Sequence, residues 1–148
     1  MTNLETLTES NSNFNLDNSM PEGGRQEEFP ATIQQYFNGL NEGQFESVSC
    51  LFAPEGELRP PFEEPVVGPE AIAAYLEAEA KGMKLYPRAE FQEGVEGENR
   101  YFEIPGQVET TVFKVNVSWF FVLNPETEIL SVRVKLLASL KELVNFRR

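Results

Sequence analysis

The chemistry available to this chain is limited first by what the sequence lacks. It contains no histidine and a single cysteine, Cys50. It therefore has no Ser-His or Cys-His pair, no histidine general base, and none of the imidazole ligands that transition metals use most often. A glycine-rich phosphate loop is also absent, because the segment 93–99 lacks the strand–turn–helix context that such a loop requires.

Carboxylates are the remaining groups with which the chain could perform acid–base chemistry. Asp and Glu together number 24, and a pair with a raised pKa could act as acid and base. The inward faces of the two most clearly predicted strands carry no acid, so we expect none inside a cavity. Five other glutamates are interpreted as solvent-facing charge without the spacing of a cation site: Glu63, Glu64, Glu79, Glu93 and Glu96.

Two aromatic residues combine an apolar body with one hydrogen-bond donor. Tyr36 lies on the apolar face of a predicted helix, and Trp119 lies on the apolar face of a predicted strand. A buried donor of this kind needs an acceptor, which a ligand with one polar end could supply. The alternative is that both residues are ordinary core aromatics whose donors bond to backbone carbonyls.

Helical segments are predicted in the first half of the chain. Apolar residues at helical spacing predict one helix between Pro30 and Asn41 and a second over 45–52. A proline-rich connection follows, with room for one short strand around Leu58. A third helix is expected over 69–82, with a proline near its start and a glycine at its end.

In the second half of the chain the apolar period changes to two, which predicts strands. The predicted strands cover 84–94, 101–108, 113–121 and 130–136. Pro105 and Gly106 weaken the middle of the second strand. Ser139 and Glu142 have the spacing of a capping box, so a short C-terminal helix is expected over 139–146.

This order of elements predicts an α+β fold. Helices gathered on one face of a curved antiparallel sheet form the economical packing, and the curl of the sheet leaves a pocket beneath the helices. The domain is expected over residues 30–148. Residues 1–29 are rich in Asn, Ser, Thr and Glu and are interpreted as a flexible tail, with a strap over the cavity mouth as the alternative.

The charge of the chain limits its partners. A net charge of −12 repels nucleic-acid phosphates and anionic lipid headgroups, and it favours solubility. No run of apolar residues is long enough to span a membrane, and no secretory signal precedes the predicted domain. Together with the single cysteine, these features favour a cytoplasmic location.

Three strings of the sequence resemble the C-terminal domain of the orange carotenoid protein: YFNGLNEGQFESVSCLF, GELRPPFEEPVVG and SWFFVLNPETEILSVRVKLLASLKELVNF. The resemblance begins near Thr32. It implies the cone-shaped fold of the nuclear transport factor 2 superfamily, and a stand-alone homolog that carries carotenoid and quenches singlet oxygen in a photosynthetic cell. It implies no enzymatic activity.

The resemblance also implies a binding site for a keto-carotenoid such as canthaxanthin or echinenone. By position, Tyr36 and Trp119 match the pair that donates hydrogen bonds to the keto oxygen of the pigment. Val112 replaces a family tryptophan, so a different cavity mouth is expected. The residues that match the family's tunnel wall are Leu40, Val67, Met83, Leu85, Phe113, Phe121, Val134 and Leu136.

Further expectations concern partners and alternatives. A pigment about 30 Å long exceeds one domain of this size, so we expect a homodimer that shares one carotenoid. The resemblance adds transfer to carotenoid-accepting helical domain proteins, with membranes only a transient source of pigment. Two alternatives stay open on the same scaffold: an isomerase- or lyase-type enzyme acting on a hydrophobic small molecule, and a dimerisation module with a filled core.

Overall fold

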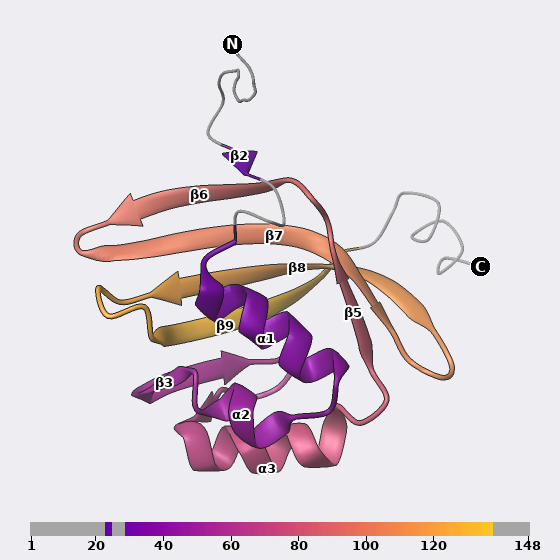
Figure 1. Cartoon of the computed structure of the whole chain (residues 1–148). Coiled ribbons are helices and arrows are strands. Elements are labelled where there is room, and N and C mark those ends of the chain that lie inside the picture. The colour runs from indigo at the N-terminus through magenta and orange to yellow at the C-terminus, as the bar shows by residue number, and fades with distance from the viewer. Residues whose placement is uncertain (1–22, 25–28, 138–148) are drawn as a thin grey trace.

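The computed structural model of the chain describes residues 23–24 and 29–137 (Figure 1). The helix predicted over 139–146 and most of the predicted tail lie outside these residues. Within the tail segment, Gly23–Gly24 form strand β2, which pairs with Phe91 and Gln92. This part of the segment is therefore an edge strand, and the tail and strap interpretations of the remainder stay predictions.

Three helices lie in the first half of the chain, where helical spacing predicts them. They are α1 (Ala31–Asn41), α2 (Phe45–Ser49) and α3 (Pro69–Glu79). The Pro30 carbonyl accepts the first backbone hydrogen bonds of α1, and a proline opens α3, where its missing N–H costs nothing.

The remaining strands complete one sheet. They are β3 (Phe52–Arg59), β4 (Val66–Val67), β5 (Lys84–Pro87), β6 (Phe91–Glu96), β7 (Asn99–Glu109), β8 (Lys114–Leu123) and β9 (Ile129–Leu137). The strand order is β2-β6-β7-β8-β9-β3-β4, and β5 pairs with β7 beside this path. The α+β class is confirmed.

The prediction of a wholly antiparallel sheet is wrong at one position, because β3 and β9 pair in parallel. Hairpin connections dictate antiparallel pairing only between successive strands. β3 and β9 lie at opposite ends of the domain sequence, so no local pattern decides their direction. Their register shifts between Phe52 and Glu57, where a Cβ on Gly56 would lie 2.6 Å from the Ile129 carbonyl oxygen.

Two predicted boundaries are also corrected. The second helix ends at Ser49 rather than at Phe52, because Phe52 begins β3 and is buried opposite Ile129. The segment 84–94 forms two strands rather than one. β5 pairs with the C-terminal part of β7 and β6 pairs with its N-terminal part, so the chain must turn between them.

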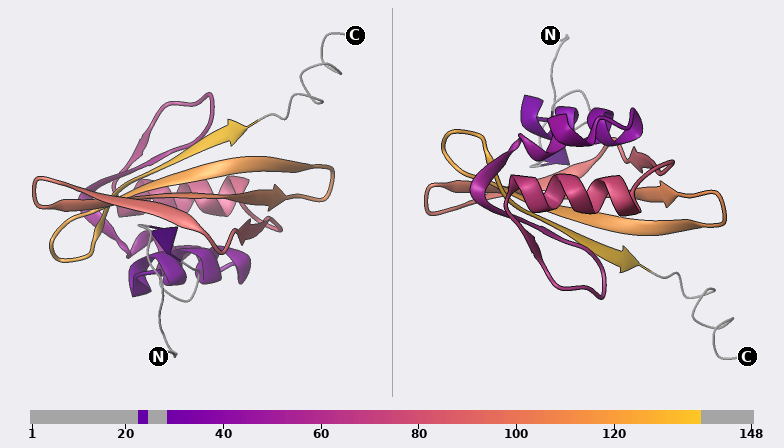
Figure 2. Two further views of the ribbon diagram at one scale, coloured as in Figure 1. Left: turned by 90° about the horizontal axis from the view of Figure 1, so that it is seen from above. Right: turned by 90° about the horizontal axis from the view of Figure 1, so that it is seen from below.

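The helices cover one face of the curved sheet (Figure 2). α1 packs on β8 through its aromatic side chains and lies beside α2 and β5, while α3 lies beside β3 and β4 (Figure 1). Alternation in β8 turns Val117, Trp119 and Phe121 toward the helices, as the sequence predicts. The hydrophobic core therefore lies between the helices and this face of the sheet.

Asn41, at the end of α1, ties the helix to β5. Its side-chain amide nitrogen donates to the Leu85 carbonyl at 2.9 Å, and its side-chain oxygen accepts from the Leu85 N–H at 2.6 Å. The Lys84 ammonium donates to the Asn41 carbonyl at 2.8 Å. The Asn41 side chain thus provides hydrogen-bond partners for both the N–H and the C=O of buried Leu85, as the backbone of a neighbouring strand would.

Asn41→Ala should lower the free energy of unfolding by about 1–3 kcal/mol, because it leaves the part-buried backbone groups of Leu85 without partners. Urea denaturation measures this change. Asn38→Ala provides the control, because Asn38 is exposed on the same helix. Equal effects of the two substitutions would contradict a specific role for Asn41.

Candidate ligand-binding site

A cavity of about 440 Å³ lies between the helices and the sheet. This volume is within the range of small-molecule sites. Its wall is mostly apolar and draws on both layers of the fold. The lining residues are Tyr36, Leu40, Leu58, Pro60, Pro61, Phe62, Glu63, Tyr75, Leu76, Glu79, Ala80, Met83, Leu85, Val108, Phe113, Val115, Val117, Trp119, Val134 and Leu136.

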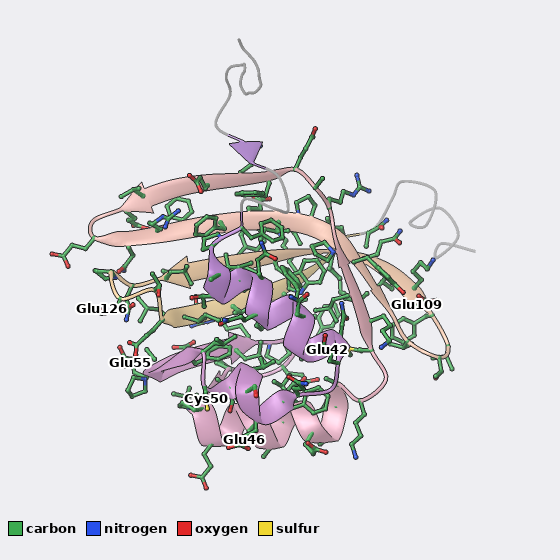
Figure 3. The ribbon with its side chains drawn as sticks, viewed as in Figure 1. Glu42, Glu46, Cys50, Glu55, Glu109 and Glu126 are labelled. Atoms are coloured by element: carbon green, nitrogen blue, oxygen red, sulfur yellow. The ribbon has the colours of Figure 1, made fainter. Side chains whose placement is uncertain are left out.

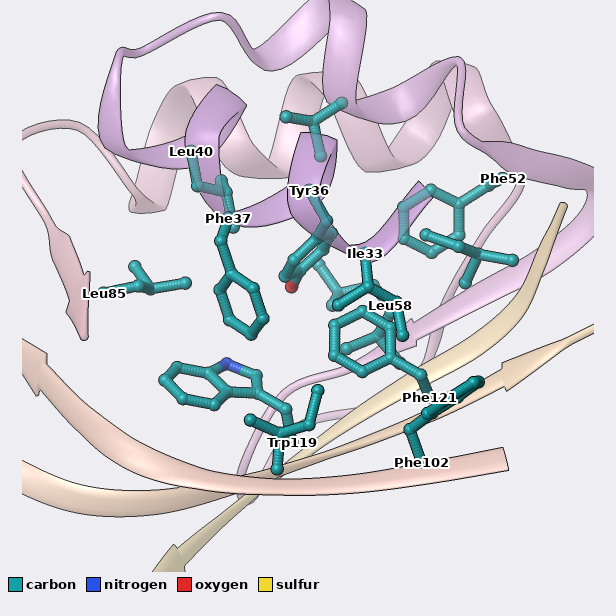
Figure 4. Packing of buried hydrophobic residues seen from close by; sticks show 14 of the residues in the cluster. Ile33, Tyr36, Phe37, Leu40, Phe52, Leu58, Leu85, Phe102, Trp119 and Phe121 are labelled. Carbon is teal, nitrogen blue, oxygen red and sulfur yellow. The ribbon is translucent and has the colours of Figure 1, made fainter. Parts of the chain in front are cut away.

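Tyr36 and Trp119 reach this cavity from opposite layers, α1 and β8. Their side chains are 2% and 1% exposed, and Figure 4 shows the Tyr36 hydroxyl and the Trp119 indole nitrogen turned toward the space between the two elements. Among the described residues, neither donor has a hydrogen-bond partner. The interpretation that both donate to backbone carbonyls is therefore not supported within this part of the chain.

A cluster of rings holds the two donors in place (Figure 4). Phe37 meets the Trp119 ring edge-on, with ring centres 4.8 Å apart. Phe121 meets the Tyr36 ring at 89°, with centres 5.1 Å apart. Edge-to-face packing of this kind stabilises one ring orientation, so both donors are positioned before any ligand arrives.

Gly106 makes room for the Trp119 ring. A Cβ at this position would lie 2.7 Å from Trp119 Cζ3 and would also meet the Tyr86 carbonyl oxygen. The weakness predicted for this part of β7 is not observed, because β7 continues through both Pro105 and Gly106. The Pro105 carbonyl instead accepts a hydrogen bond from the Arg88 N–H at 2.8 Å.

Polar groups at the cavity mouth come from α3 and from the loop after β3. Tyr75 is partly buried, and its environment raises its pKa to about 12, chiefly through desolvation. The negative charge of Glu63, a hydrogen bond to its carboxylate and the charge of Glu79 raise this pKa further. Burial also raises the pKa of Tyr36, with a smaller contribution from Tyr75.

Eight of the ten predicted site residues line this one cavity. Phe121 does not, because it is fully buried beneath Tyr36 and supports that ring. Val67 does not either, because it lies on β4 and is 55% exposed. The eight residues that the fold brings together are Tyr36, Leu40, Met83, Leu85, Phe113, Trp119, Val134 and Leu136.

Several residues of the site were not predicted. Glu63 and Glu79 are exposed, as the sequence predicts. They also line the cavity mouth, which the sequence analysis did not predict. Tyr75 and Phe37 lie on predicted apolar helix faces, and that pattern was the available signal. It could not distinguish a cavity wall from a filled core.

Other reactive groups lie away from the cavity. Cys50 is exposed at the end of α2, and Glu46 and Glu126 lie at the periphery of the fold (Figure 3). No group of three or more acidic or cysteine side chains that could hold a metal ion occurs within the described ranges. In the same part of the chain, no helix is long and apolar enough to cross a membrane.

This geometry suits an elongated apolar molecule with a hydrogen-bond acceptor at one end. The chain matches the nuclear transport factor 2 (NTF2) domain over residues 29–132. It belongs to this family. The match covers the three helices and the strands from β3 to the start of β9, and it ends before Val134 and Leu136 of the cavity wall.

Within the family, the chain is similar to the orange carotenoid-binding protein of Synechocystis sp., with 38% identity over 122 residues. The match covers 80% of this chain and 38% of that relative, so the chain spans well under half of the relative's length. The matching part of the relative is its C-terminal region.

Solved structures agree with this similarity. The Anabaena (Nostoc) sp. PCC 7120 orange carotenoid protein, determined with canthaxanthin, matches with a TM-score of 0.70 and 34% identity over 78% of this chain and 38% of its own. The epoxide hydrolase/cyclase-like enzyme SalBIII matches with a TM-score of 0.59 at 19% identity, over 76% of this chain and 91% of its own. At that identity the second likeness shows the fold alone.

Tyr36→Phe should change the unfolding free energy of the empty protein by less than about 1 kcal/mol, because the lost hydroxyl has no described partner. Thr32→Val is the matched control on the same helix, since the Thr32 hydroxyl donates to the Thr127 carbonyl at 2.8 Å. It should cost about 1–2 kcal/mol. A larger loss for Tyr36→Phe than for the control would show that the hydroxyl has a structural role.

The Tyr36→Phe variant should also alter stability at high pH. Burial raises the pKa of Tyr36, so the folded chain keeps this proton where the unfolded chain, with a pKa near 10, has lost it. Stability therefore falls as the pH rises above about 10, and the variant should lack the part of this fall due to Tyr36. Denaturant curves between about pH 8 and 11 test this, and parallel pH profiles would contradict it.

Proposed function

We propose that this chain binds a keto-carotenoid in its cavity, with Tyr36 and Trp119 donating hydrogen bonds to the keto oxygen. The observation that carries the proposal is the pair of buried donors that face an apolar cavity without a described partner. One carbonyl oxygen has two lone pairs and can accept from both. Similarity to the orange carotenoid-binding protein supports the same ligand class.

Apolar burial and hydrogen bonding contribute to such binding in different ways. Removing a polyene from water is worth about 25 cal/mol per Å², which supplies affinity but little information about register. Two donors add about 1 kcal/mol each. They determine which end of the pigment enters the cavity and how far it enters.

The donors should also tune the colour of the pigment. Hydrogen bonds to the keto oxygen draw electron density toward that end of the conjugated system, which shifts its absorption to longer wavelength. The photochemistry belongs to the pigment, while the protein supplies orientation and electrostatics.

The double variant Tyr36→Phe with Trp119→Phe should bind pigment that absorbs at shorter wavelength and is lost more readily. The expected loss of affinity is about 2 kcal/mol, because two hydrogen bonds are removed. Expression in carotenoid-producing cells, followed by absorption spectroscopy and pigment extraction, measures both effects.

Tyr101→Phe is the control for this experiment, since Tyr101 is exposed on β7 and lies outside the cavity. β-Carotene offers a second comparison, because it lacks a keto oxygen and should load less well into the wild type. An unchanged absorption maximum in the double variant, or equal loading of the two pigments, would overturn the assignment of the donors.

The proposal includes a carrier role: the chain would hold the pigment, deliver it to helical domain proteins and quench singlet oxygen. The expected setting is the cytoplasm of a photosynthetic cell. A cavity of about 440 Å³ suits one end of a pigment about 30 Å long. The other end would leave through the mouth, and a second copy related by two-fold symmetry would cover it.

Under this proposal, the loaded protein should contain one carotenoid for every two chains. Native mass spectrometry of the coloured species measures the stoichiometry directly. The pigment-free protein examined under the same conditions is the control, and it should dimerise more weakly. A loaded monomer with one pigment per chain would contradict shared binding.

A catalytic role is the second candidate function, because the fold is shared with the enzyme SalBIII. The observation in its favour is that Glu63 and Glu79 line the cavity mouth beside Tyr75. Both glutamates are exposed rather than held in the apolar interior of the cavity. The position of these acids favours binding over catalysis. A colourless protein from carotenoid-producing cells would reverse this preference.

A further inference from the structure

The edge of β9 that faces β3 is open over residues 134–137. β9 pairs with β8 as far as Leu137, which lies opposite Asn116, whereas its parallel pairing with β3 ends where Arg133 lies opposite Arg59. No other described strand pairs with β9. Within the described part of the chain, the backbone groups on this edge therefore have no strand partner and could take one.

Prolines explain why β3 does not continue along this edge. Pro60 and Pro61 follow Arg59 directly, and neither has an N–H to donate to β9. The loop 60–65, which contains a third proline, Pro65, leaves the sheet here. A hollow of about 500 Å³ lies between this loop and β9, so an extended segment has room beside the open edge.

Side chains along the edge alternate between the two faces of the sheet. Val134 lies opposite Trp119 on β8 and lines the cavity, as does Leu136 two residues further on. Arg133 and Lys135 therefore project from the opposite face, outside the cavity. The edge thus presents apolar side chains on one side of the sheet and cations on the other.

The cations on the outer face are not matched by acids. The Arg133 guanidinium lies over the Phe120 ring at 6.0 Å, and Arg59 is its neighbour on β3. Arg59 forms an ion pair with Glu57 at 2.9 Å, whereas neither Arg133 nor Lys135 forms one with another described residue. Opposite charges on neighbouring strands stabilise a sheet, and a further strand beside β9 could supply them.

We propose that the open edge of β9 binds an extended segment of a partner protein in which acidic and apolar residues alternate. The segment would add to the sheet as a strand, held by backbone hydrogen bonds. Its acidic side chains would lie beside Arg133 and Lys135, and its apolar side chains would contact Val134 and Leu136. A strand has a side-chain period of two, so one segment meets both requirements.

A second copy of β9 does not suit this edge. Two β9 strands related by a two-fold axis would pair antiparallel, with the outer face of one continuous with the outer face of the other. Arg133 and Lys135 of one copy would then lie beside the same cations of its partner. Like charges across a strand pair are destabilising, which favours an acidic segment as the occupant.

Two acidic features of the chain act against such a segment. Glu63 lines the same hollow, although its carboxylate hydrogen-bonds with Tyr75 on the cavity side of the sheet. The net charge of −12 repels any acidic peptide at long range. The experiment therefore compares peptides of equal charge, so that only the match to the edge differs.

This inference goes beyond the proposed function and does not depend on it, because the edge needs no pigment. The hollow shares Phe62, Val134 and Leu136 with the cavity wall, so a bound segment would lie beside the cavity mouth. The pigment-free full chain is used for the test, and a failure of carotenoid binding would leave its result unchanged.

The test is fluorescence anisotropy with labelled hexapeptides. The probe alternates Glu and Val, and we expect it to bind. A block peptide with three Glu followed by three Val has the same composition and charge. It should bind about tenfold more weakly, because it cannot match both faces of the edge. Equal binding of the two peptides would overturn the proposal.

Backbone methylation tests whether the peptide binds as a strand. Two further versions of the alternating peptide are N-methylated, one at every Glu nitrogen and the other at every Val nitrogen. Only every second N–H of a strand faces its neighbour, so one version should bind about tenfold more weakly than the other. Equal affinities of the two versions would contradict strand addition.

Charge reversal tests the outer face of the edge. Arg133→Glu with Lys135→Glu should weaken binding of the Glu/Val peptide about tenfold and should favour a Lys/Val peptide instead. Lys81→Glu with Arg88→Glu is the matched control, since it makes the same change of net charge at exposed positions outside the hollow. Reversal is a gain of binding, so a misfolded variant cannot produce it, and an equal reversal in the control would refute the assignment.

Sedimentation of the pigment-free protein distinguishes a second copy as the occupant. The alternating peptide should leave the oligomeric state of the chain unchanged. If the peptide dissociates a dimer that the block peptide leaves intact, the edge pairs two copies of the chain and the proposal of a partner segment is wrong.

Discussion

The packing of α1 against β8 is the interaction on which the rest of this structure depends. Phe37 meets Trp119 at 4.8 Å and Phe121 meets Tyr36 at 5.1 Å, both nearly perpendicular. These contacts bring the two layers of the fold together and bury two hydrogen-bond donors at the same time. Because the rings prefer edge-to-face geometry, the donors are held in one orientation. The cavity begins where this aromatic packing ends, and its apolar wall continues to the open mouth.

A donor without an acceptor adds no hydrogen bond to the empty fold, and the cost stays small at Tyr36 and Trp119 because both donors face the cavity. A core optimised only for stability would replace both donors with apolar rings. Gly106 adds a second cost, because a glycine within β7 is needed to leave space for the Trp119 ring. Such costs are expected where a ligand completes the hydrogen bonding of the fold, and they concentrate here at one end of one cavity.

The net charge of this chain and the local charge of its surfaces differ in sign at some positions. The net charge of −12 led to the expectation that anionic lipid headgroups are repelled. The sheet nevertheless brings Arg59 and Arg133 together from strands that are far apart in sequence. Total charge governs long-range repulsion, whereas contact at short range depends on which side chains share a surface. Net charge therefore does not describe the charge of any one face of the molecule.

Much of the fold was determined by the sequence alone, because periodicity reports which side of an element is buried. Alternation over 113–121 predicted that Trp119 faces the core, and helical spacing predicted the same for Tyr36; both are confirmed. Periodicity does not report what covers the buried side. Only the tertiary structure decided that β3 pairs in parallel with β9, that Phe121 supports Tyr36 rather than lining the cavity, and that Glu63 and Tyr75 meet at its mouth. These contacts join residues that are distant in the chain, and their geometry follows from how the sheet curves and from how the helices pack on it.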